Sequence, residues 1–359
     1  MMFAVRIAAV LATAALGLSL APHAQAQTAA EVALKAKYKA PRNGFGQPDL
    51  NGVWTNATLT PVQREAKYGE RLVISAEEAA AIEKATSSAA DTANAPTDPN
   101  AKVTDLPHDC GGGFTGVNCG YNSFWIDAGT SLLTINGEKR TSIYTTPNGR
   151  SPGLKPEAAK RMREMFAGYR SGSMGNADGP EVRSLGERCL MSFGSSAGPP
   201  MLPLLYNNNY QIVQTPDAVM IEVEMVHDVR VVRLNAKHDA ANIKRWMGDS
   251  IGWWDGDTLV IETINLRPEQ NYRLTSDSYK VTERLTRVAP NQILYSFTVE
   301  DETYTGPLTG ELMFTATKGP LYEYACHEGN HALPGILRGA RMEEADAKKA
   351  AEAPKAAAG

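Results

Sequence analysis

Three segments in the second half of the chain alternate apolar and polar residues, and the apolar side of each carries one proton-active residue. They are segment 219–234 with His227, segment 279–288 with Glu283 and segment 293–302 with Asp301. Because side chains on a strand repeat every two residues, we expect these groups to point where the apolar side chains point. Burying such a group costs several kcal/mol unless it is paired. The pattern therefore predicts a polar site inside a β-structure.

General acid–base catalysis is the chemistry that these residues could perform. A carboxylate that orients an imidazole makes a base poised near neutral pH. Glu283 or Asp301 could orient His227 from another strand, whereas Asp228 cannot, because adjacent strand residues face opposite sides. Desolvation on the apolar face would raise the pKa of Glu283 and suit it to general-acid work. We therefore expect His227 and Glu283 to be the central catalytic pair.

Each of the three residues also has a structural interpretation. His227 could be a buried histidine held by hydrogen bonds, and Asp301 could be a turn acid at the rim. Glu283 could instead form an internal ion pair with Arg230 or Arg284.

A further histidine, His327, directly follows Cys326. If Cys326 is in a disulfide, His327 is held at the mouth of a loop, where functional sites are common, so we expect it beside Asp301 at the mouth of the site. His327 and His331 have the i, i+4 spacing of a zinc-binding helix, but the intervening Gly and Asn disfavour a helix. We expect no cofactor, and a zinc or calcium site formed by His227, His327 and a carboxylate is the alternative.

Aromatic rings and side-chain amides predict a wall for a small organic or sugar-like ligand. Asn amides both donate and accept hydrogen bonds, so they can bind hydroxyl and carbonyl groups. The structural alternatives are a turn that uses Asn for left-handed backbone positions, and Trp side chains that belong to the core. The residues expected to contact the ligand are Tyr206, Asn207, Asn208, Asn209, Arg230, Trp246, Trp254 and Tyr304.

The order of these segments predicts a mainly β fold with N-terminal helical and loop elaborations. Short alternating segments joined by turns follow residue 210, and they favour an antiparallel β-barrel or a lipocalin-like curled sheet. Asp255-Gly256 is a strong hairpin signal. Besides the three segments above, the expected strands are 122–135, 141–146, 251–254, 258–264, 308–315 and 321–328, and the expected helices are 75–85 and 156–169.

Composition and the start of the chain predict a periplasmic or secreted protein. Residues 1–26 resemble a signal peptide, with Arg6, an apolar run and the small-x-small site Ala24-Gln25-Ala26. No later segment has the ~20 apolar residues that a membrane span needs. The chain has 359 residues, 43% of them hydrophobic, and a net charge of −4, which argues against nucleic acid as the main partner. The oligomeric state is left open.

The four cysteines favour disulfides in an oxidising compartment. Cys110 and Cys119 flank a Gly-rich loop and are expected to pair locally, which leaves Cys189 and Cys326 for a long-range bridge. Four cysteines permit three pairings, so the connectivity stays open. The expected divisions of the chain are a signal peptide at 1–26, a lead-in with a helix and a flexible loop at 27–104, a barrel-like domain at 105–341 and a tail at 342–359.

Several stretches resemble a family of uncharacterised secreted proteins that is common in Gram-negative and soil bacteria. The stretches are residues 48–54 (PDLNGVW), 184–189 (SLGERC), 206–216 (YNNNYQIVQTP), 253–260 (WWDGDTLV) and 322–330 (YEYACHEGN). The resemblance covers residues 48–341, implies a coherent fold and implies no particular activity. The chain departs from the family pattern in the loop 109–120 and at His331, where an aromatic residue is expected.

Taken together, the residues favour a cofactor-independent enzyme of the lyase, isomerase or hydrolase type that acts on a small organic or sugar-like substrate in a barrel cavity. The first alternative is a lipocalin-like carrier in which the same residues only orient a ligand. The second is a metal-dependent hydrolase or lyase, and the third is an envelope partner protein without a cavity.

Overall fold

The structure is a computed structural model, and it describes residues 28–35, 37–93, 100, 127–171, 177–192, 198–267 and 275–352. The expected signal peptide and the expected Cys110–Cys119 bridge lie outside these residues. Within the described part of the chain, no helix combines the length and the apolar character that a membrane crossing requires.

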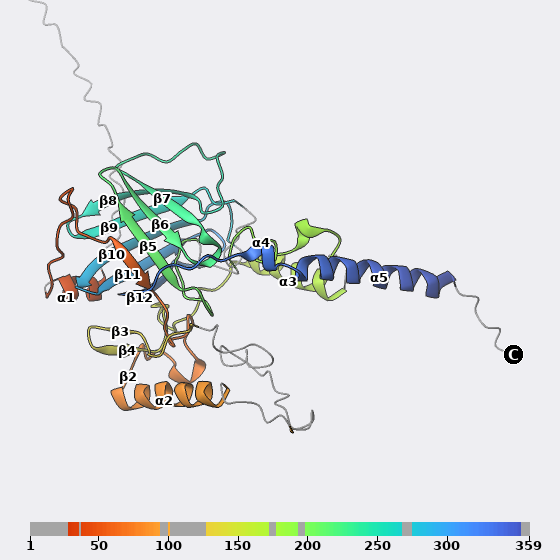
Figure 1. The fold of residues 1–359 in the computed structure, drawn as a ribbon, viewed down its shortest axis with the longest axis horizontal. Helices are drawn as coiled ribbons and strands as arrows, with labels where there is room; N and C mark the ends of the chain where they lie inside the picture. Colours follow the sequence, from red (N-terminus) through yellow and green to blue (C-terminus); the bar gives the residue numbers. More distant parts are fainter. Residues whose placement is uncertain are drawn as a thin grey trace, which may run out of the picture.

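Nine strands close into a single β-barrel (Figure 1). Their order around the barrel is β1-β12-β11-β10-β9-β8-β7-β6-β5, and every neighbouring pair is antiparallel except β7 and β8. The prediction of a mainly β chain with an antiparallel barrel is therefore confirmed. The strands are β1 (Gly52–Thr55), β5 (Asn209–Gln214), β6 (Ala218–Val223), β7 (Val229–Leu234), β8 (Asp249–Asp255), β9 (Thr258–Ile264), β10 (Lys280–Ala289), β11 (Gln292–Glu300) and β12 (Leu308–Ala316).

Local turn chemistry sets two hairpins of the barrel. Gly256 has a φ of 63°, a left-handed conformation that glycine adopts without strain, and it links β8 to β9 as predicted. β10 and β11 pair along their whole length on either side of the predicted turn at Pro290. This pairing places Glu283 opposite Phe297 on the inward face, so the alternation of both strands was read correctly.

The expected single strand 219–234 is wrong. It is two strands, β6 and β7, separated by a 3-10 turn over Met225–His227 in which Val226 and His227 have φ values of 63° and 47°. The turn changes which residues face inward, from odd positions such as Ile221 on β6 to even positions such as Arg230 on β7. Val229 and Val231 are consequently 46% and 53% exposed on the outer wall.

Other predicted elements also differ. Residues 321–328 do not form a strand, because the chain leaves the barrel there and enters the short helix α4 (Cys326–Gly329). In the described part of 122–146, the strands are only β3 (Thr134–Ile135) and β4 (Glu138–Arg140). Helix α2 (Ala76–Ala93) continues beyond the predicted end at residue 85 into the expected loop.

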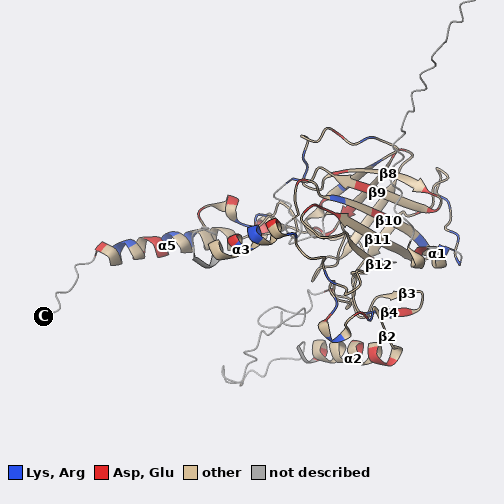
Figure 2. Ribbon diagram, turned by 180° about the vertical axis from the view of Figure 1, so that it is seen from behind, with Lys and Arg blue, Asp and Glu red and all other residues tan. Residues whose placement is uncertain are grey.

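The remaining elements lie around the barrel. β3, β4 and β2 (Val73–Ile74) form a small sheet beside α2, and α1 (Ala29–Lys35) lies against β10. The C-terminal helix α5 (Ala332–Glu352) extends away from the barrel, with α3 (Pro156–Ser171) near its base (Figures 1 and 2). Arg341 of α5 donates hydrogen bonds to the carbonyls of Ala177 and Asp178. The short 3-10 helices are Ala66–Tyr68, Pro180–Val182 and Met225–His227.

Aromatic side chains occupy the centre of the barrel. Phe314 makes edge-to-face contacts with Tyr210 and Tyr295, at centroid distances of 5.1 and 5.5 Å. Phe297 lies 5.8 Å from Tyr295, over Gly310, where a Cβ would come within 2.4 Å of its ring. These rings pack against one another as side chains of a hydrophobic core do.

Residues 198–203 are all buried, and Met201 and Leu202 belong to the hydrophobic core; we call this segment the plug. Side chains from three separate parts of the chain hold its backbone. The amide of Met201 donates to the hydroxyl of Tyr295 at 2.9 Å, and the amide of Asn56 donates to the carbonyl of Met201 at 3.2 Å. The hydroxyl of Tyr279 donates to the carbonyl of Pro199 at 2.8 Å. These bonds satisfy backbone groups that water cannot reach.

Tyr295 links this plug to the ion pair of Arg230 and Glu283, of which 3% and 0% are exposed. Both terminal nitrogens of Arg230 donate to the Glu283 carboxylate, and the Tyr295 hydroxyl donates to Oε1 of Glu283 at 2.8 Å. Burial alone would lower the pKa of Arg230, but the charge and hydrogen bonds of Glu283 raise it. Burial, and then the charge of Glu283, raise the pKa of Tyr295, so its hydroxyl stays a donor. The structural interpretation of Glu283 is confirmed.

We predict that Glu283→Gln lowers the free energy of unfolding by about 3–5 kcal/mol, because it leaves the Arg230 charge buried without a counter-charge. The double variant Arg230→Met/Glu283→Leu should recover most of this loss. Urea unfolding measures both. Glu344→Gln, which breaks the exposed pair with Arg341, is the control and should cost less than about 1 kcal/mol. A loss below about 1 kcal/mol for Glu283→Gln would contradict this role of the pair.

Candidate functional site

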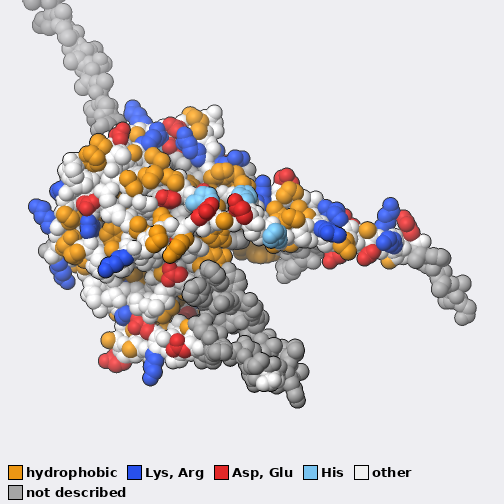
Figure 3. Space-filling view, in the orientation of Figure 1, with side chains coloured by type: hydrophobic (Ala, Val, Ile, Leu, Met, Phe, Trp, Pro, Cys, Tyr) orange, Lys and Arg blue, Asp and Glu red, His pale blue; other side chains and the backbone are white. Residues whose placement is uncertain are grey.

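The structure does not bring the four expected catalytic residues together. His227 lies in the turn after β6 and is exposed, whereas Glu283 is fully buried and held by Arg230 and Tyr295. The expected inward position of His227 is wrong because the left-handed turn interrupts the strand. Figure 3 shows histidine side chains on the surface near the base of α5. The two residues of the expected catalytic pair therefore lie in different environments, one at the surface and one in the core.

Asp301 and His327 have local roles instead. Asp301 follows β11 and accepts hydrogen bonds from the backbone amides of Ser276 and Thr303, at 2.9 and 2.8 Å. This is the turn role that the sequence also allowed. His327 lies in α4 and is exposed.

Of the residues expected to contact a ligand, Tyr206, Asn207 and Asn209 line one groove, and the others lie elsewhere. Asn208 is fully buried and fixes a turn, because its side chain bonds the backbone at Leu204 and Asp127. Arg230 belongs to the buried ion pair. The remaining three are Trp246, whose ring lies 4.3 Å from the Arg267 guanidinium, Trp254, half-buried on β8, and Tyr304, 3% exposed near the end of β11.

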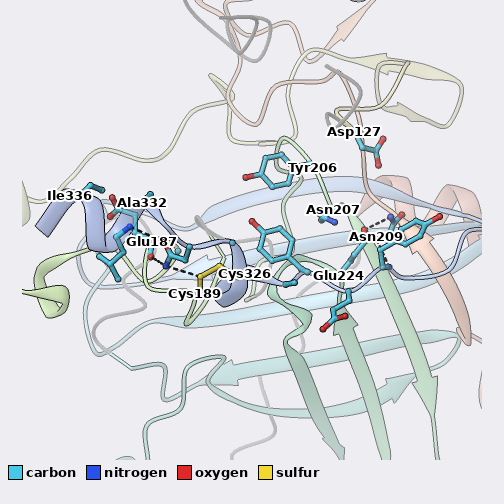
Figure 4. Close-up of a pocket in the computed structure, with 18 residues that line it drawn as sticks. Asp127, Glu187, Cys189, Tyr206, Asn207, Asn209, Glu224, Cys326, Ala332 and Ile336 are labelled. Atoms are coloured by element: carbon cyan, nitrogen blue, oxygen red, sulfur yellow. Dashed lines mark hydrogen bonds between the residues drawn. A yellow bond between two sulfur atoms is a disulfide. The ribbon is translucent and has the colours of Figure 1, made fainter. Parts of the chain in front are cut away.

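The candidate site is a groove of about 730 Å³ at the rim of the barrel, which we call the rim groove. Figure 4 shows its labelled side chains in a row, from Ile336 and Ala332 of α5, past the Cys189–Cys326 disulfide, to Asn209 and Asp127. The groove therefore has an apolar end and a polar end. Its volume is within the range of small-molecule sites. The residues that line it are Asp127, Gly186, Glu187, Cys189, Tyr206, Asn207, Asn209, Glu224, Tyr322, Glu323, Tyr324, Ala325, Cys326, Gly329, Asn330, Ala332, Leu333 and Ile336.

The first wall of the rim groove continues directly from the plug. The Asn208 turn follows residues 198–203, and Asn207 has a φ of 55°, a left-handed position that Asn tolerates. This turn places Tyr206 and Asn207 at the groove, and Asn209 begins β5. The sequence thus allowed both interpretations of the Asn run, and the structure shows a turn whose side chains also line a cavity.

The C-terminal segment supplies the second wall. Cys189 and Cys326 form the predicted long-range disulfide, with 5.6 Å between their Cα atoms. The Asn330 side chain donates to the carbonyl of Glu187 at 2.8 Å, beside the disulfide. Tyr324 lies nearly parallel to Tyr206, with ring centroids 6.5 Å apart and 9° between the planes. These contacts attach residues 322–330 to the barrel rim.

Carboxylates set the electrostatics of the rim groove, and the described residues that line it include no Lys, Arg or His. Glu224 is 3% exposed and accepts from the Asn209 side chain at 2.7 Å and from the Tyr322 amide at 3.1 Å. Both donors are neutral, so its negative charge is not compensated by them. Asp127 remains exposed, but partial desolvation and then the charge of Glu224 raise its pKa.

Two further groups of the rim groove have shifted pKa values. Burial, and then the charge and hydrogen bond of Tyr324, raise the pKa of Tyr206 to about 12, so its hydroxyl remains protonated at neutral pH. Burial alone would raise the pKa of Glu187, but hydrogen bonds from Arg183 and Ser184 lower it. Arg183 therefore compensates Glu187 and not Glu224.

Sequence reasoning missed the carboxylates and the C-terminal tyrosines of the rim groove. Glu224 sits in an alternating segment and was read as a strand residue. The available signal was the predicted Cys189–Cys326 bridge, which brings residues 184–189 next to 322–330. The Asn run at 207–209 then supplies the third segment.

A second polar cluster lies on the outer wall of β8 and β9. His238 lies 3.0 Å from Asp249 through Nδ1 and 3.2 Å from Glu262 through Nε2, and Arg233 donates to Asp249 at 2.7 Å. Burial alone would lower the pKa of His238, but its bonds to Glu262 and Asp249 raise it. Among the described residues, no three His, Cys, Asp or Glu side chains group as metal ligands do.

Asp228, next to His227, has an uncommon environment. Its Oδ2 is buried and has no hydrogen-bond partner among the described residues. Burial raises its pKa to about 6, against the opposing effect of the His227 charge. Ionisation of Asp228 is less favourable in the folded state than in the unfolded state, so it lowers the free energy of unfolding. This loss of stability is absent below pH 3.8 and complete above about pH 6.

Comparison with known proteins finds no matching family model, no matching curated protein and no matching solved structure. The site is therefore interpreted from its own geometry.

We predict that Asp228→Asn stabilises the fold by about 1 kcal/mol at pH 8, a value reduced for its partial exposure to solvent. At pH 3.5 the variant and the wild type should be equally stable, because the wild-type carboxyl is then protonated in both states. Thermal unfolding at the two pH values measures the difference. An equal change at both values would show that ionisation is not the cause.

Proposed function

We propose that the protein binds a small, hydroxyl-rich organic molecule, such as a sugar derivative, in the rim groove. The single observation that carries this proposal is the convergence of three distant segments on one cavity of about 730 Å³. Tyrosine rings and side-chain amides line it, together with a buried carboxylate that has only neutral donors. Amides and carboxylates bind hydroxyl groups, and aromatic rings pack against the apolar faces of a ligand.

The shape of the groove supports a ligand with two different ends. Asn207, Asn209 and Glu224 lie at the polar end, and Ala332 and Ile336 of α5 lie at the other end, beside Glu187, whose charge Arg183 compensates. A sugar with an alkyl or aryl substituent fits this distribution. The stretches at 184–189, 206–216 and 322–330, on which the family resemblance rests, all contribute lining residues.

We predict that Tyr324→Ala weakens the binding of an alkyl glycoside by about 10- to 100-fold, because one aromatic wall of the groove is lost. A thermal-shift screen of monosaccharides and their alkyl glycosides identifies a binder, and calorimetric titration gives the affinities.

His227→Ala is the control for this prediction, since His227 is exposed and does not line the groove. It should bind as the wild type does. The proposal fails if no member of the screen binds the wild type, or if Tyr324→Ala binds as tightly as the control.

An enzyme is the second candidate, and the pairing of Asp127 with Glu224 favours it. Asp127 has a raised pKa beside a carboxylate that accepts two hydrogen bonds, and both line the same open groove. Two carboxylates in different environments can act as general acid and general base. In this second candidate function, the expected lyase, isomerase or hydrolase reaction takes place in the rim groove and not in the barrel interior.

For a glycoside that is converted, we predict that Asp127→Asn lowers kcat by about 10²- to 10⁴-fold and leaves binding nearly unchanged. Mass spectrometry of the incubated ligand detects conversion, and calorimetry reports binding. Tight binding without conversion would contradict the enzyme candidate and support binding only. An unchanged rate in Asp127→Asn would contradict the role of Asp127 in catalysis.

A further inference from the structure

A second, smaller pocket of about 300 Å³ lies on the outer wall of the barrel, across β10, β11 and β12. Its walls carry the hydroxyl groups of Ser296, Thr298, Thr309 and Thr145, and of Thr28, which precedes α1, and Arg284 lines the pocket as well. One carboxylate, that of Glu311, also lines it. The volume is at the low end of the range for small-molecule sites. The pocket shares no lining residue with the rim groove.

The carboxylate of Glu311 has no partner. The residue is 7% exposed, and its side chain makes no hydrogen bond or ion pair within the described part of the chain. Arg284 lines the same pocket but does not pair with Glu311. Glu311 is opposite Ser296, and Ser296 is opposite Arg284, so the two charged residues are two strands, or about 10 Å, apart along the sheet.

Arg284 is moreover already neutralised. It donates to Glu31 of α1 at 2.8 and 2.9 Å and to Asp255 at 2.7 Å. Burial alone would lower its pKa, but these two carboxylates raise it.

Comparison with the other buried carboxylates shows how unusual Glu311 is. Glu31, Asp249 and Glu283 are each paired with at least one arginine, and Glu224 accepts two N–H groups. Glu311 is the one buried carboxylate residue of the described chain whose acceptors are left to whatever enters its pocket. A cation in the pocket would give it a partner.

We propose that this pocket binds a primary ammonium group through Glu311. An ammonium group needs three acceptors, and the carboxylate with the hydroxyl oxygens of Ser296 and Thr298 can supply them. The Thr309 hydroxyl already accepts a hydrogen bond from Thr145 at 2.8 Å, so we assign it to the wall of the pocket and not to the three acceptors. One unpaired negative charge with neutral hydroxyls around it, in a lining that also contains Arg284 paired with Glu31 and Asp255, favours a monovalent cation over a divalent metal ion.

The ammonium group has two sources with the same chemistry. One is a free small amine. The other is the amino group of the chain itself, because the cleavage expected after Ala26 would create one at Gln27, the residue before Thr28 in the sequence. The experiment distinguishes the two.

Ethylamine is titrated into the purified protein and binding is followed by thermal shift and NMR. Tetramethylammonium, which has no N–H donor, is added at the same ionic strength as a comparison. Mass spectrometry identifies the first residue, and reductive methylation reports how accessible its amino group is. Glu311→Gln removes only the charge, and Glu302→Gln, an exposed carboxylate near the same end of the strands, is the matched control.

If a free amine is the ligand, ethylamine raises the Tm of the wild type and of Glu302→Gln, tetramethylammonium does not, and Glu311→Gln binds ethylamine at least about tenfold more weakly. If the chain end is the ligand, the wild type does not bind ethylamine, its amino group resists methylation, and Glu311→Gln restores the labelling. If Glu311→Gln does not fold, Glu311→Asp, which withdraws the carboxylate by one methylene group, should show the same changes to a smaller degree. Ethylamine binding that is equal in all variants, or no binding together with a freely labelled amino group in the wild type, would overturn the proposal.

Discussion

The buried pair of Arg230 and Glu283 is the constraint around which the barrel is organised. Two opposite charges inside an apolar core are tolerated only when each satisfies the other and the remaining lone pairs have donors. Tyr295 supplies the additional donor to Glu283, and its oxygen in turn accepts the Met201 amide. The charged pair thus determines where the plug at 198–203 must sit. Aromatic rings pack beside this pair, and Glu283 uses its carboxylate to bind Arg230 and Tyr295 within the core.

The plug and the rim groove are linked by chain continuity. The chain leaves the plug, makes the Asn208 turn and places Tyr206, Asn207 and Asn209 at the rim before β5 begins. The opposite wall comes from a segment that the Cys189–Cys326 disulfide and Asn330 hold in place. A rigid interior therefore supports a site on its edge. This arrangement leaves a carboxylate, Glu224, with neutral donors alone, and it defines a polar end for a hydroxyl-rich ligand.

The sequence predicted those parts of the fold that depend on local patterns. Alternation in β10 and β11 correctly gave the inward side of Glu283, and an ion pair with Arg230 was among the interpretations it allowed. Cysteine pairing gave the long-range bridge. The position of His227 could not be predicted, because two left-handed residues in a short turn exchange the two faces of the following strand. The rim groove was missed for another reason: alternation carries no information about which loops meet, and only the predicted Cys189–Cys326 bridge indicated that two of its walls lie side by side.

The central claim is that the barrel interior is a sealed core and that ligands bind at its rim. Amide hydrogen exchange of the wild type, with and without a bound alkyl glycoside, tests it most directly. The account predicts slow and unchanged exchange in β10, β11 and the Met201 amide, and added protection at the Tyr322 amide and the 204–209 turn. Added protection of the β10 and β11 amides with no change at the rim would contradict the account, because it would place the ligand inside the barrel.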